Sequence, residues 1–503
     1  MPISRRSLLA CAPALLLPRR SRAQDAIPDI AKGPYNGAES LKQYRIPEWF
    51  RDFKFGMWAH WGPQSAAEDG DWYARNIYIQ DSPQYKDHVK TYGHPSKFGH
   101  KDLCQIWNGR EFDADHLIQL YKKAGARYFM SMGVHHDNFD LWNSKHQPRW
   151  NAVATGPKKD VVGLFRDAAR KHGLKFAVSE HLSNSYNWLA VSHYADKTGP
   201  MAGVPYDGQD PAYADLYHHF DNREPIPQAM SRNAPDSWKR LYFQRIQDLI
   251  DNYLPDLLYT DGGIPFGEWG YKLVSHYYNR VPNGLYTSKN RKDCDEGTCA
   301  LDIERGVAND ILPNPWQTDT CIGNWHYKRG QNYKTGKTVV DLLCDIVSRN
   351  GNLMLNVPLP NSGKPDDEEL KVVEEITKWM AVNSEGIYST RPWKVAGNAA
   401  PPAAGGGRMG FNERNRKDLT AADVRFTTKG GTLYAFVMGW PEREAEIATL
   451  ALGGKTGVGK IRSVELLGHK GKLKYTQDER SLRITLPPEK PSDHAVAFKI
   501  LGA

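Results

Sequence analysis

Several short apolar stretches of this chain end in polar side chains of the kinds that carry out acid–base, nucleophilic or metal chemistry. An acid at the tip of a buried strand, followed by small residues that leave room for a ligand, suits nucleophilic attack. Asp261 is therefore the candidate nucleophile; the alternative use of its Asp-Gly pair is an Asx-turn that closes the strand. The clusters are Ala59-His60-Trp61-Gly62, Val134-His135-His136-Asp137, Ser179-Glu180-His181 and Thr260-Asp261-Gly262-Gly263.

The histidines of these clusters allow two kinds of chemistry, metal ligation or hydrogen bonding to the hydroxyl groups of a sugar. The chain has no HExxH motif. Neighbouring residues on a strand point to opposite faces, so His135 and His136 are not expected to bind one ion together. We expect no metal and no other cofactor, and a metal-dependent hydrolase is the alternative.

Such clusters need a scaffold that brings strand ends together, and residues 45–360 alternate short apolar strands with helical patterns. In one predicted helix the apolar residues from Val161 to Ala169 follow helical spacing, with Asp160 placed to cap it and Gly173 to end it. Repeated βα units predict an α/β fold, a (β/α)8-like TIM barrel with its active site at the carboxyl ends of the strands. The expected strands are Lys54–Ala59, Tyr128–Met132, Lys175–Ser179, Asp256–Thr260, Gly284–Thr287 and Asn352–Val357.

A second domain follows a stretch rich in Ala, Gly and Pro. We predict a catalytic barrel over residues 24–395, a linker over 396–410 and an antiparallel β-sandwich over 411–503. The sandwich is indicated by short stretches with alternating apolar residues between Gly or Pro turns. These stretches are Val424–Thr427, Thr432–Val437, Leu482–Leu486 and Ala495–Phe498.

Composition excludes several classes of function. No apolar run reaches the roughly 18 residues that span a bilayer. The formal charge of the 503 residues is +8, but five arginines and no acids lie within residues 1–23, so the remainder carries only about +3. That excess is too small to predict a nucleic-acid partner. The 15 Trp and 25 Tyr suit a protein that handles sugars.

The first residues read as an export signal. Residues 1–23 contain Ser4-Arg5-Arg6-Ser7, which resembles a twin-arginine signal, followed by a short apolar stretch and a small-residue cleavage site ending at Ala23. A lipoprotein signal ending at Cys11 is less favoured because the apolar stretch before it is too short. We expect a periplasmic or extracellular protein. Of its cysteines, Cys294 and Cys299 either form a disulfide or stay as free thiols.

The clusters and their flanking residues resemble the alpha-L-fucosidases of glycoside hydrolase family 29. The matching segments run in order along the chain, from residue 45 to about 395. They are Phe53–Gly62 (the family's K-F-G…H-W-G), Asp71–Arg75 (E-W-Y…R), Lys123–Tyr128 with His135–Trp142 (A-G-A-K-Y…K-H-H-D-G-F), Asp256–Gly262 (the nucleophile strand), Asn350–Val357 (G-G-N-L-L-L-N-I) and Asn383–Tyr388 (N-G-E-A-I-Y).

The resemblance implies exo-hydrolysis of a terminal alpha-L-fucosyl unit of a glycan, with retention at the anomeric carbon. Asp261 would attack that carbon, and a second carboxyl group would serve as acid and then as base. The residues implied in substrate binding are His60, Asp71, Trp72, His135, His136 and Trp325.

The sequence departs from the family where the general acid is expected. Asn314-Pro315-Trp316-Gln317 stands where many members have P-W-E, and Gln317 cannot give up a proton. Glu304 is our candidate for the acid, and Glu268, Asp295 and Glu296 are the reserves. Asp302 would face the opposite way if this segment is a strand. The family's N-D-R segment is also altered, which leaves its arginine's role with either Lys289 or Arg291.

Three other functions remain open at this stage. An alpha-L-galactosidase on the same scaffold would differ only in the pocket around C5 of the sugar. A catalytically silent fucose-binding protein is suggested by the loss of Glu at position 317, and intact Asp261 argues against it. The third is the metal-dependent hydrolase. The sequence sets neither the linkage preference nor the oligomeric state.

Overall fold

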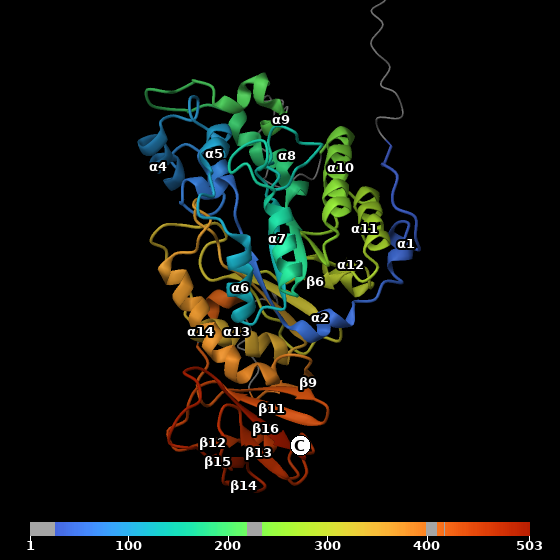
Figure 1. The fold of residues 1–503 in the computed structure, drawn as a ribbon, viewed down its shortest axis with the longest axis vertical. Helices are drawn as coiled ribbons and strands as arrows, with labels where there is room; N and C mark the ends of the chain where they lie inside the picture. The colour runs from blue at the N-terminus through green and yellow to red at the C-terminus, as the bar shows by residue number, and fades with distance from the viewer. Residues whose placement is uncertain (1–25, 219–233, 399–409, 417) are drawn as a thin grey trace, which may run out of the picture.

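Eight parallel strands form the wall of a nearly closed barrel (Figure 1). The computed structural model describes residues 26–218, 234–398, 410–416 and 418–503. The strand order is β6-β5-β4-β3-β2-β1-β8-β7, and a parallel bridge from Asp302 to Gln317 draws β6 and β7 together. The strands are β1 (Phe55–Ala59), β2 (Tyr128–Val134), β3 (Lys175–Glu180), β4 (Leu257–Thr260), β5 (Leu285–Ser288), β6 (Ala300–Leu301), β7 (Trp316–Cys321) and β8 (Gly351–Asn356).

The barrel fold and its six expected strands are confirmed, while β6 and β7 were not expected from the sequence. β6 has only two residues, too few for a recognisable pattern. β7 reads WQTDTC and is buried at every position despite its polar residues. Those residues have partners inside the barrel: Gln317 donates to Asp302 over 2.9 Å, and Thr318 donates to the carbonyl of Gly306 over 2.7 Å.

Helices cover the outside of the barrel, and their ends follow the expected local chemistry. α7 (Val161–Lys171) begins where the Asp160 side chain accepts a hydrogen bond from the amide of Gly163, and it is followed by Gly173 at φ 71°. The other long helices are α4 (Pro83–Tyr92), α6 (Ala114–Lys123), α10 (Asp236–Tyr253), α11 (Glu268–Arg280), α13 (Gly336–Ser348) and α14 (Asp367–Asn383). The short ones are α1 (Ala38–Leu41), α2 (Glu48–Phe53), α3 (Tyr73–Asn76), α5 (His100–Ile106), α8 (Ser185–Trp188), α9 (Ala214–Tyr217) and α12 (Arg291–Asp295).

The C-terminal domain is a pair of antiparallel sheets, in the orders β13-β16-β11-β10-β9 and β12-β15-β14. Alternate residues of β11 enter different cores: Leu433 and Ala435 face the second sheet, whereas Tyr434 and Phe436 pack with the barrel. The strands are β9 (Arg391–Gly397), β10 (Val424–Lys429), β11 (Thr432–Val437), β12 (Glu444–Ile447), β13 (Ser463–Leu466), β14 (Tyr475–Gln477), β15 (Leu482–Thr485) and β16 (Val496–Leu501).

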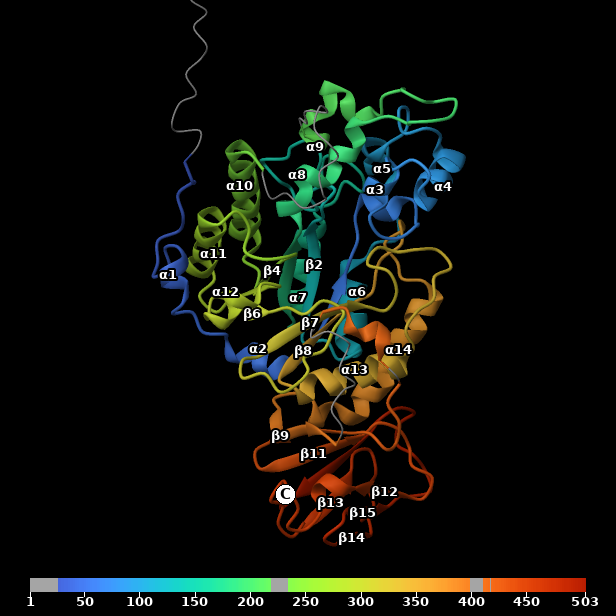
Figure 2. The ribbon, with the colours of Figure 1, turned by 180° about the vertical axis from the view of Figure 1, so that it is seen from behind.

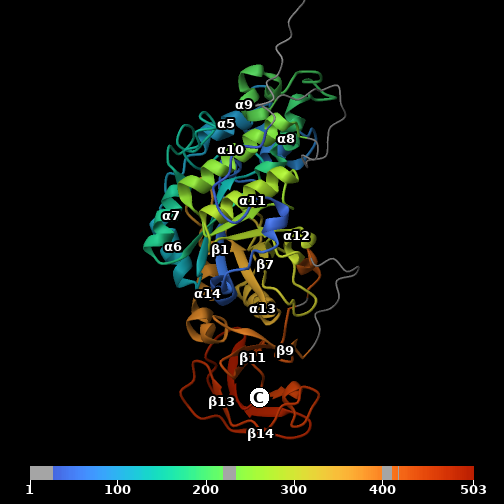
Figure 3. The same cartoon turned by 90° about the vertical axis from the view of Figure 1, so that its right-hand side faces the viewer.

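β9 is the edge strand of the larger sheet, so this sheet starts within the stretch that we assigned to the end of the barrel and the start of the linker. Most of the expected linker, and the expected export signal, lie outside the described residues. No helix in the described part of the chain has the length and apolar character needed to cross a bilayer. The C-terminal sheets lie at one end of the barrel, and α8 and α9 lie at the other (Figures 2 and 3).

A buried carboxylate joins the two domains. Asp345 of α13 has no exposed surface and bonds three arginines: Arg349 of its own helix, Arg425 of β10 and Arg416, which precedes β10. Trp379 of α14 adds a second tie by donating to the carbonyl of Ala495 over 2.7 Å. Because buried cations need a buried anion nearby, the contact between the domains depends on Asp345.

Asp345→Asn is expected to lower the free energy of unfolding by about 3–5 kcal/mol, because it leaves buried guanidinium groups without a counter-charge. The measurement is chemical or thermal unfolding followed by tryptophan fluorescence. Glu368→Gln is the control, since Glu368 forms an exposed pair with Lys371 and should cost less than about 1 kcal/mol. Equal stability of the two variants would contradict this role of Asp345.

Candidate active site

One cavity of about 1220 Å³ opens at the carboxyl ends of the barrel strands. Every residue that we predicted for the site lines it, although they come from separate loops spread over more than 240 positions of the chain. These residues are His60, Asp71, Trp72, His135, His136, Asp261, Glu304 and Trp325. Asp302 and the reserve acids Glu268, Asp295 and Glu296 are absent from its lining, whereas the two candidate catalytic acids, Asp261 and Glu304, both line it.

Asp261 lies directly after β4, with its side chain 21% exposed. Its amide donates to the carbonyl of Glu180 over 3.2 Å, which continues the pairing of β3 and β4 by one residue. This hydrogen bond fixes the backbone from which the Asp261 carboxylate projects. Gly262 follows at φ 114°, a conformation that a side chain would oppose, and its carbonyl accepts from the amide of Lys289 over 2.8 Å. The two glycines thus turn the chain away and leave Asp261 facing the cavity.

Lys289, the residue after β5, connects the two acids. Its Nζ lies 2.7 Å from Oδ1 of Asp261 and 2.6 Å from Oε2 of Glu304, and it is 3.7 Å from Oδ2 of Asp319. Of the two residues left open for the altered N-D-R segment, Lys289 lines the cavity and Arg291 does not. Arg291 is 59% exposed and pairs with Asp295 outside the cavity.

The surroundings drive the pKa values of the two acids in opposite directions. Burial would raise the pKa of Asp261, but the Lys289 ammonium and the contacts from His136 and His181 hold it well below its usual value. Burial raises the pKa of Glu304; Lys289 opposes this, while Asp319 and Asp261 add to it. A carboxyl group with a lowered pKa beside one with a raised pKa is the arrangement of a nucleophile and a general acid.

The histidines form a layer beside Asp261. His136 places Nε2 3.2 Å from Oδ2 of Asp261, and its Nδ1 hydrogen-bonds with the carbonyl of His181 over 2.8 Å. His181 lies 3.4 Å from the same carboxylate oxygen. Burial keeps the pKa values of His60 and His135 well below the usual value, so these two rings are neutral and can exchange hydrogen bonds with a ligand.

The expectation that His135 and His136 point to opposite faces is wrong. β2 ends at Val134, so both histidines lie in the turn after it, where strand alternation no longer applies. Their side chains both line the cavity, with ring centroids 4.6 Å apart. Together with His181 they offer nitrogen atoms within 4.8 Å of one another, which is close enough for a metal ion. His136, however, already uses one nitrogen for Asp261 and the other for a carbonyl group.

Aromatic rings form part of the cavity wall. Trp325 lies beside His60 with a centroid distance of 4.9 Å, and the guanidinium of Arg305 lies 4.9 Å from its ring centre. Trp72 has a left-handed backbone, at φ 60°, and its ring is nearly perpendicular to that of His136, with centroids 6.2 Å apart. Asp71 bonds Nδ1 of the buried His326 over 2.9 Å, which fixes its carboxylate at the cavity wall.

Sequence reasoning missed Asp319. It is buried on β7, lines the cavity, and accepts a hydrogen bond from the hydroxyl of Tyr259 over 2.9 Å. Its position two residues after Gln317 on the same strand was the available signal, but β7 itself was not recognised. Gln317 lies inside the barrel against Asp302 and is absent from the lining of the cavity, as its inability to serve as the acid suggested.

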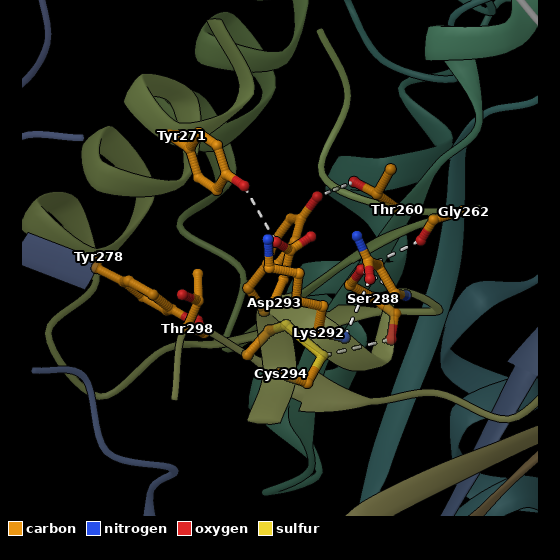
Figure 4. The surroundings of a disulfide bond; sticks show 12 residues. Thr260, Gly262, Tyr271, Tyr278, Ser288, Lys292, Asp293, Cys294 and Thr298 are labelled. Carbon is orange, nitrogen blue, oxygen red and sulfur yellow. Dashed lines mark hydrogen bonds between the residues drawn. A yellow bond between two sulfur atoms is a disulfide. The ribbon is translucent and has the colours of Figure 1, made fainter. Parts of the chain in front are cut away.

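A disulfide clips the segment between Lys289 and Glu304. Cys294 of α12 bonds Cys299, which precedes β6, with Cα atoms 4.5 Å apart; of the two states left open, the chain has the bridged one. Figure 4 shows polar contacts on both sides of the bridge: Ser288 towards Gly262, and Tyr271 to Asp293 at 3.0 Å. The disulfide holds β6 near β5. Lys289, after β5, and Glu304, after β6, therefore stay close enough to form their ion pair.

A (β/α) barrel whose strand ends hold a lysine-bridged pair of carboxyl groups in a cavity is typical of a glycoside hydrolase. The comparisons with known proteins agree. The family model described as alpha-L-fucosidase matches residues 26–385, and the one described as alpha-L-fucosidase C-terminal domain matches residues 416–501. The chain belongs to the alpha-L-fucosidase family, which confirms the resemblance found in the sequence.

Relatives match over most of their length. Plasma alpha-L-fucosidase of Homo sapiens is 26% identical over 472 residues, covering 89% of this chain and 87% of that protein. Tissue alpha-L-fucosidase of Rattus norvegicus is 25% identical over 476 residues, covering 91% and 89%. The crystal structure of Thermotoga maritima alpha-fucosidase in complex with a mechanism-based inhibitor shares the fold, with a TM-score of 0.71 at 23% identity, covering 93% of this chain and 100% of that one.

Lys289→Met is expected to move both limbs of the pH profile of kcat/KM to higher pH. The ammonium lowers the pKa of Asp261 and also opposes the rise at Glu304, so its loss lets both values increase. The acid limb follows ionisation of Asp261 and the alkaline limb follows deprotonation of Glu304.

Lys239→Met is the matched control, because Lys239 lines the same cavity but pairs with Asp236. Limbs that stay in place in Lys289→Met, or that move equally in both variants, would show that Lys289 does not set these pKa values.

Proposed function

We propose that this enzyme releases terminal alpha-L-fucosyl units from glycans with retention of configuration, with Asp261 as nucleophile and Glu304 as acid/base. The observation that carries the proposal is the Lys289 bridge. Contacts of 2.7 and 2.6 Å to one nitrogen limit the two bound carboxylate oxygens to a separation of about 5.3 Å at most. Retaining glycosidases hold their carboxyl groups about 5–5.5 Å apart, whereas inverting ones need about 6.5–9.5 Å.

In the first step, Oδ of Asp261 forms a bond to the anomeric carbon while the glycosidic C–O bond breaks. Glu304 gives its proton to the departing oxygen, which leaves as a neutral alcohol, and the sugar becomes an ester of Asp261. The low pKa of Asp261 keeps it ionised for attack, and the raised pKa of Glu304 keeps a proton available.

In the second step, Glu304 as carboxylate takes a proton from a water molecule, whose oxygen bonds the anomeric carbon. The bond to Asp261 breaks, the free sugar leaves, and Glu304 is again protonated. Two inversions at the same carbon give net retention. Lys289 contacts both acids throughout, so it stabilises whichever carboxylate is ionised in each step.

The sugar itself would be held by the residues around Asp261. The neutral rings of His60 and His135 and the ring of His136 suit fucose hydroxyl groups, with Asp71, Trp72 and Trp325 completing the wall. An aromatic ring against the C5 methyl group favours fucose, because the hydroxymethyl group of L-galactose would bury an unpaired hydroxyl there. The family match and the names of the relatives support fucose.

The first test of the function compares 4-nitrophenyl alpha-L-fucoside with the alpha-L-galactoside, using the purified protein. Preference for the fucoside, abolished in Asp261→Ala, is the expected result. Preference for the galactoside would support the alternative sugar. Fucose binding without turnover of either substrate would indicate a binding protein, and loss of turnover on exhaustive chelation would indicate a metal-dependent hydrolase.

The roles of the two acids are separable by azide rescue of an activated aryl fucoside. In Glu304→Ala the ester forms but hydrolyses slowly, and azide should restore turnover and give alpha-L-fucosyl azide, because it intercepts the ester. In Asp261→Gly, azide should replace the nucleophile and give the inverted beta-L-fucosyl azide. The measurement is the anomeric configuration of the product by NMR.

Asp302→Ala is the control for this assignment, since Asp302 is buried next to Gln317 and is absent from the lining of the cavity. It should show no azide rescue. If azide rescues Asp302→Ala and not Glu304→Ala, the acid/base has been misassigned.

We also propose export through the twin-arginine route, on the basis of Arg5 and Arg6. The Cys294–Cys299 disulfide supports an oxidising destination. Replacing both arginines by lysine is expected to retain the protein in the cytoplasm, which fractionation and a thiol-labelling assay would detect. An unchanged location would point to another export route.

A further inference from the structure

The segment that leads into β10 of the C-terminal sheet returns to the active site. The amide of Phe411 donates to the carbonyl of Glu304 over 2.8 Å, and the amide of Glu413 donates to the carbonyl of Arg305 over 3.1 Å. Between them, the Asn412 side chain accepts from the amide of Val307 and donates to its carbonyl, over 3.1 and 2.9 Å. The segment is thus attached to the backbone that carries the candidate acid.

Buried side chains hold this attachment in place. The Glu413 carboxylate, 7% exposed, accepts hydrogen bonds from Arg305 at 3.2 Å, Thr320 at 2.8 Å and Lys334 at 3.2 Å. Arg305 in turn lies over the ring of Trp325. The position of Phe411 is therefore fixed by groups on both sides of the strand end that carries Glu304.

Phe411 has a strained backbone, and the packing of its own side chain does not compensate for the strain. Its backbone is left-handed, at φ 57° and ψ 21°, which a bulky side chain rarely adopts, and its side chain is 54% exposed. Within the described part of the chain, six large hydrophobic side chains are exposed, and Phe411 is the only one that lines the cavity. Strained backbone held by its surroundings is typical of a site that presents a side chain to a ligand.

Phe411 lies on the side of the cavity that holds Glu304, and this position indicates which part of the substrate it would contact. Glu304 gives its proton to the leaving oxygen, so the leaving group must lie next to Glu304. The histidines that suit fucose follow β1 and β2 instead. We propose that Phe411 is the platform for the leaving-group sugar, a hexopyranose whose C–H face packs on the phenyl ring. This inference rests on the proposed function and goes beyond it, since it names the chemistry of the second sugar.

The test compares two substrates that share fucose and differ in the leaving group. Alpha-L-fucosyl fluoride has no second sugar, and a panel of fucosyl-galactose and fucosyl-N-acetylglucosamine disaccharides does. Phe411→Ala is expected to lower kcat/KM about tenfold for the disaccharides that the wild type hydrolyses, and to leave fucosyl fluoride within about twofold. Phe411→Trp is expected to keep disaccharide activity, because it retains a flat ring.

Leu254→Ala is the matched control. Leu254 is also exposed, at 37%, and also has a left-handed backbone, at φ 45°, but it is absent from the cavity lining. The Leu254→Ala variant should leave kcat/KM unchanged for both fucosyl fluoride and the disaccharides. An unchanged pH profile of Phe411→Ala on the disaccharide would show that Glu304 has not moved.

Three outcomes would overturn the inference: equal losses on fluoride and disaccharide, no loss on the disaccharides, or a wild type that hydrolyses the fluoride and none of the disaccharides. A wild type that hydrolyses neither kind of substrate would overturn the proposed function itself, and the platform with it.

Discussion

One lysine ammonium group, shared among buried acids, is the interaction on which the rest of this structure depends. Lys289 lies within hydrogen-bonding distance of Asp261 and Glu304 and near Asp319, all at the mouth of the barrel. Three carboxyl groups this close together would repel one another and could not all be ionised without a cation between them. Each comes from a different strand end, so the barrel must close around β4 to β7 for the ion pair to form. The bridge between Asp302 and Gln317 and the disulfide beside β6 both serve that closure.

Lys289 lowers the pKa of both of its partners, yet their net shifts are opposite because their other neighbours differ. Asp261 also contacts His136 and His181, which stabilise its charge, and its pKa falls despite burial. At Glu304, burial and the like charges of Asp319 and Asp261 raise the pKa in spite of Lys289. The division of labour between nucleophile and acid therefore follows from what surrounds each carboxyl group, and both groups are of the same chemical kind.

Most of the barrel could be predicted from the sequence, because its strands are apolar runs that end in polar clusters. The two strands that were not predicted lack that signal. β6 is only two residues long. β7 buries polar residues, whose burial is stabilised by hydrogen bonds to other parts of the chain that no local pattern shows. Asp319 was missed for this reason. The error about His135 and His136 came from extending strand alternation two residues beyond Val134. Phe411 could not be found at all, since its place beside Glu304 is a contact across more than a hundred positions that no local pattern encodes.

The attachment of residues 410–413 to the strand end of Glu304 also bears on how such proteins can diversify. A glycosidase whose accessory domain is merely tethered can exchange that domain for another by recombination without disturbing catalysis. Here the segment between β9 and β10 hydrogen-bonds the backbone of Glu304, and Asp345 ties α13 of the barrel to β10 of the sheets. A crossover anywhere between the barrel and the sheets would alter the wall of the cavity. Barrel and sheets must therefore be inherited as one unit, and drift in the second domain can change which glycans the first one accepts.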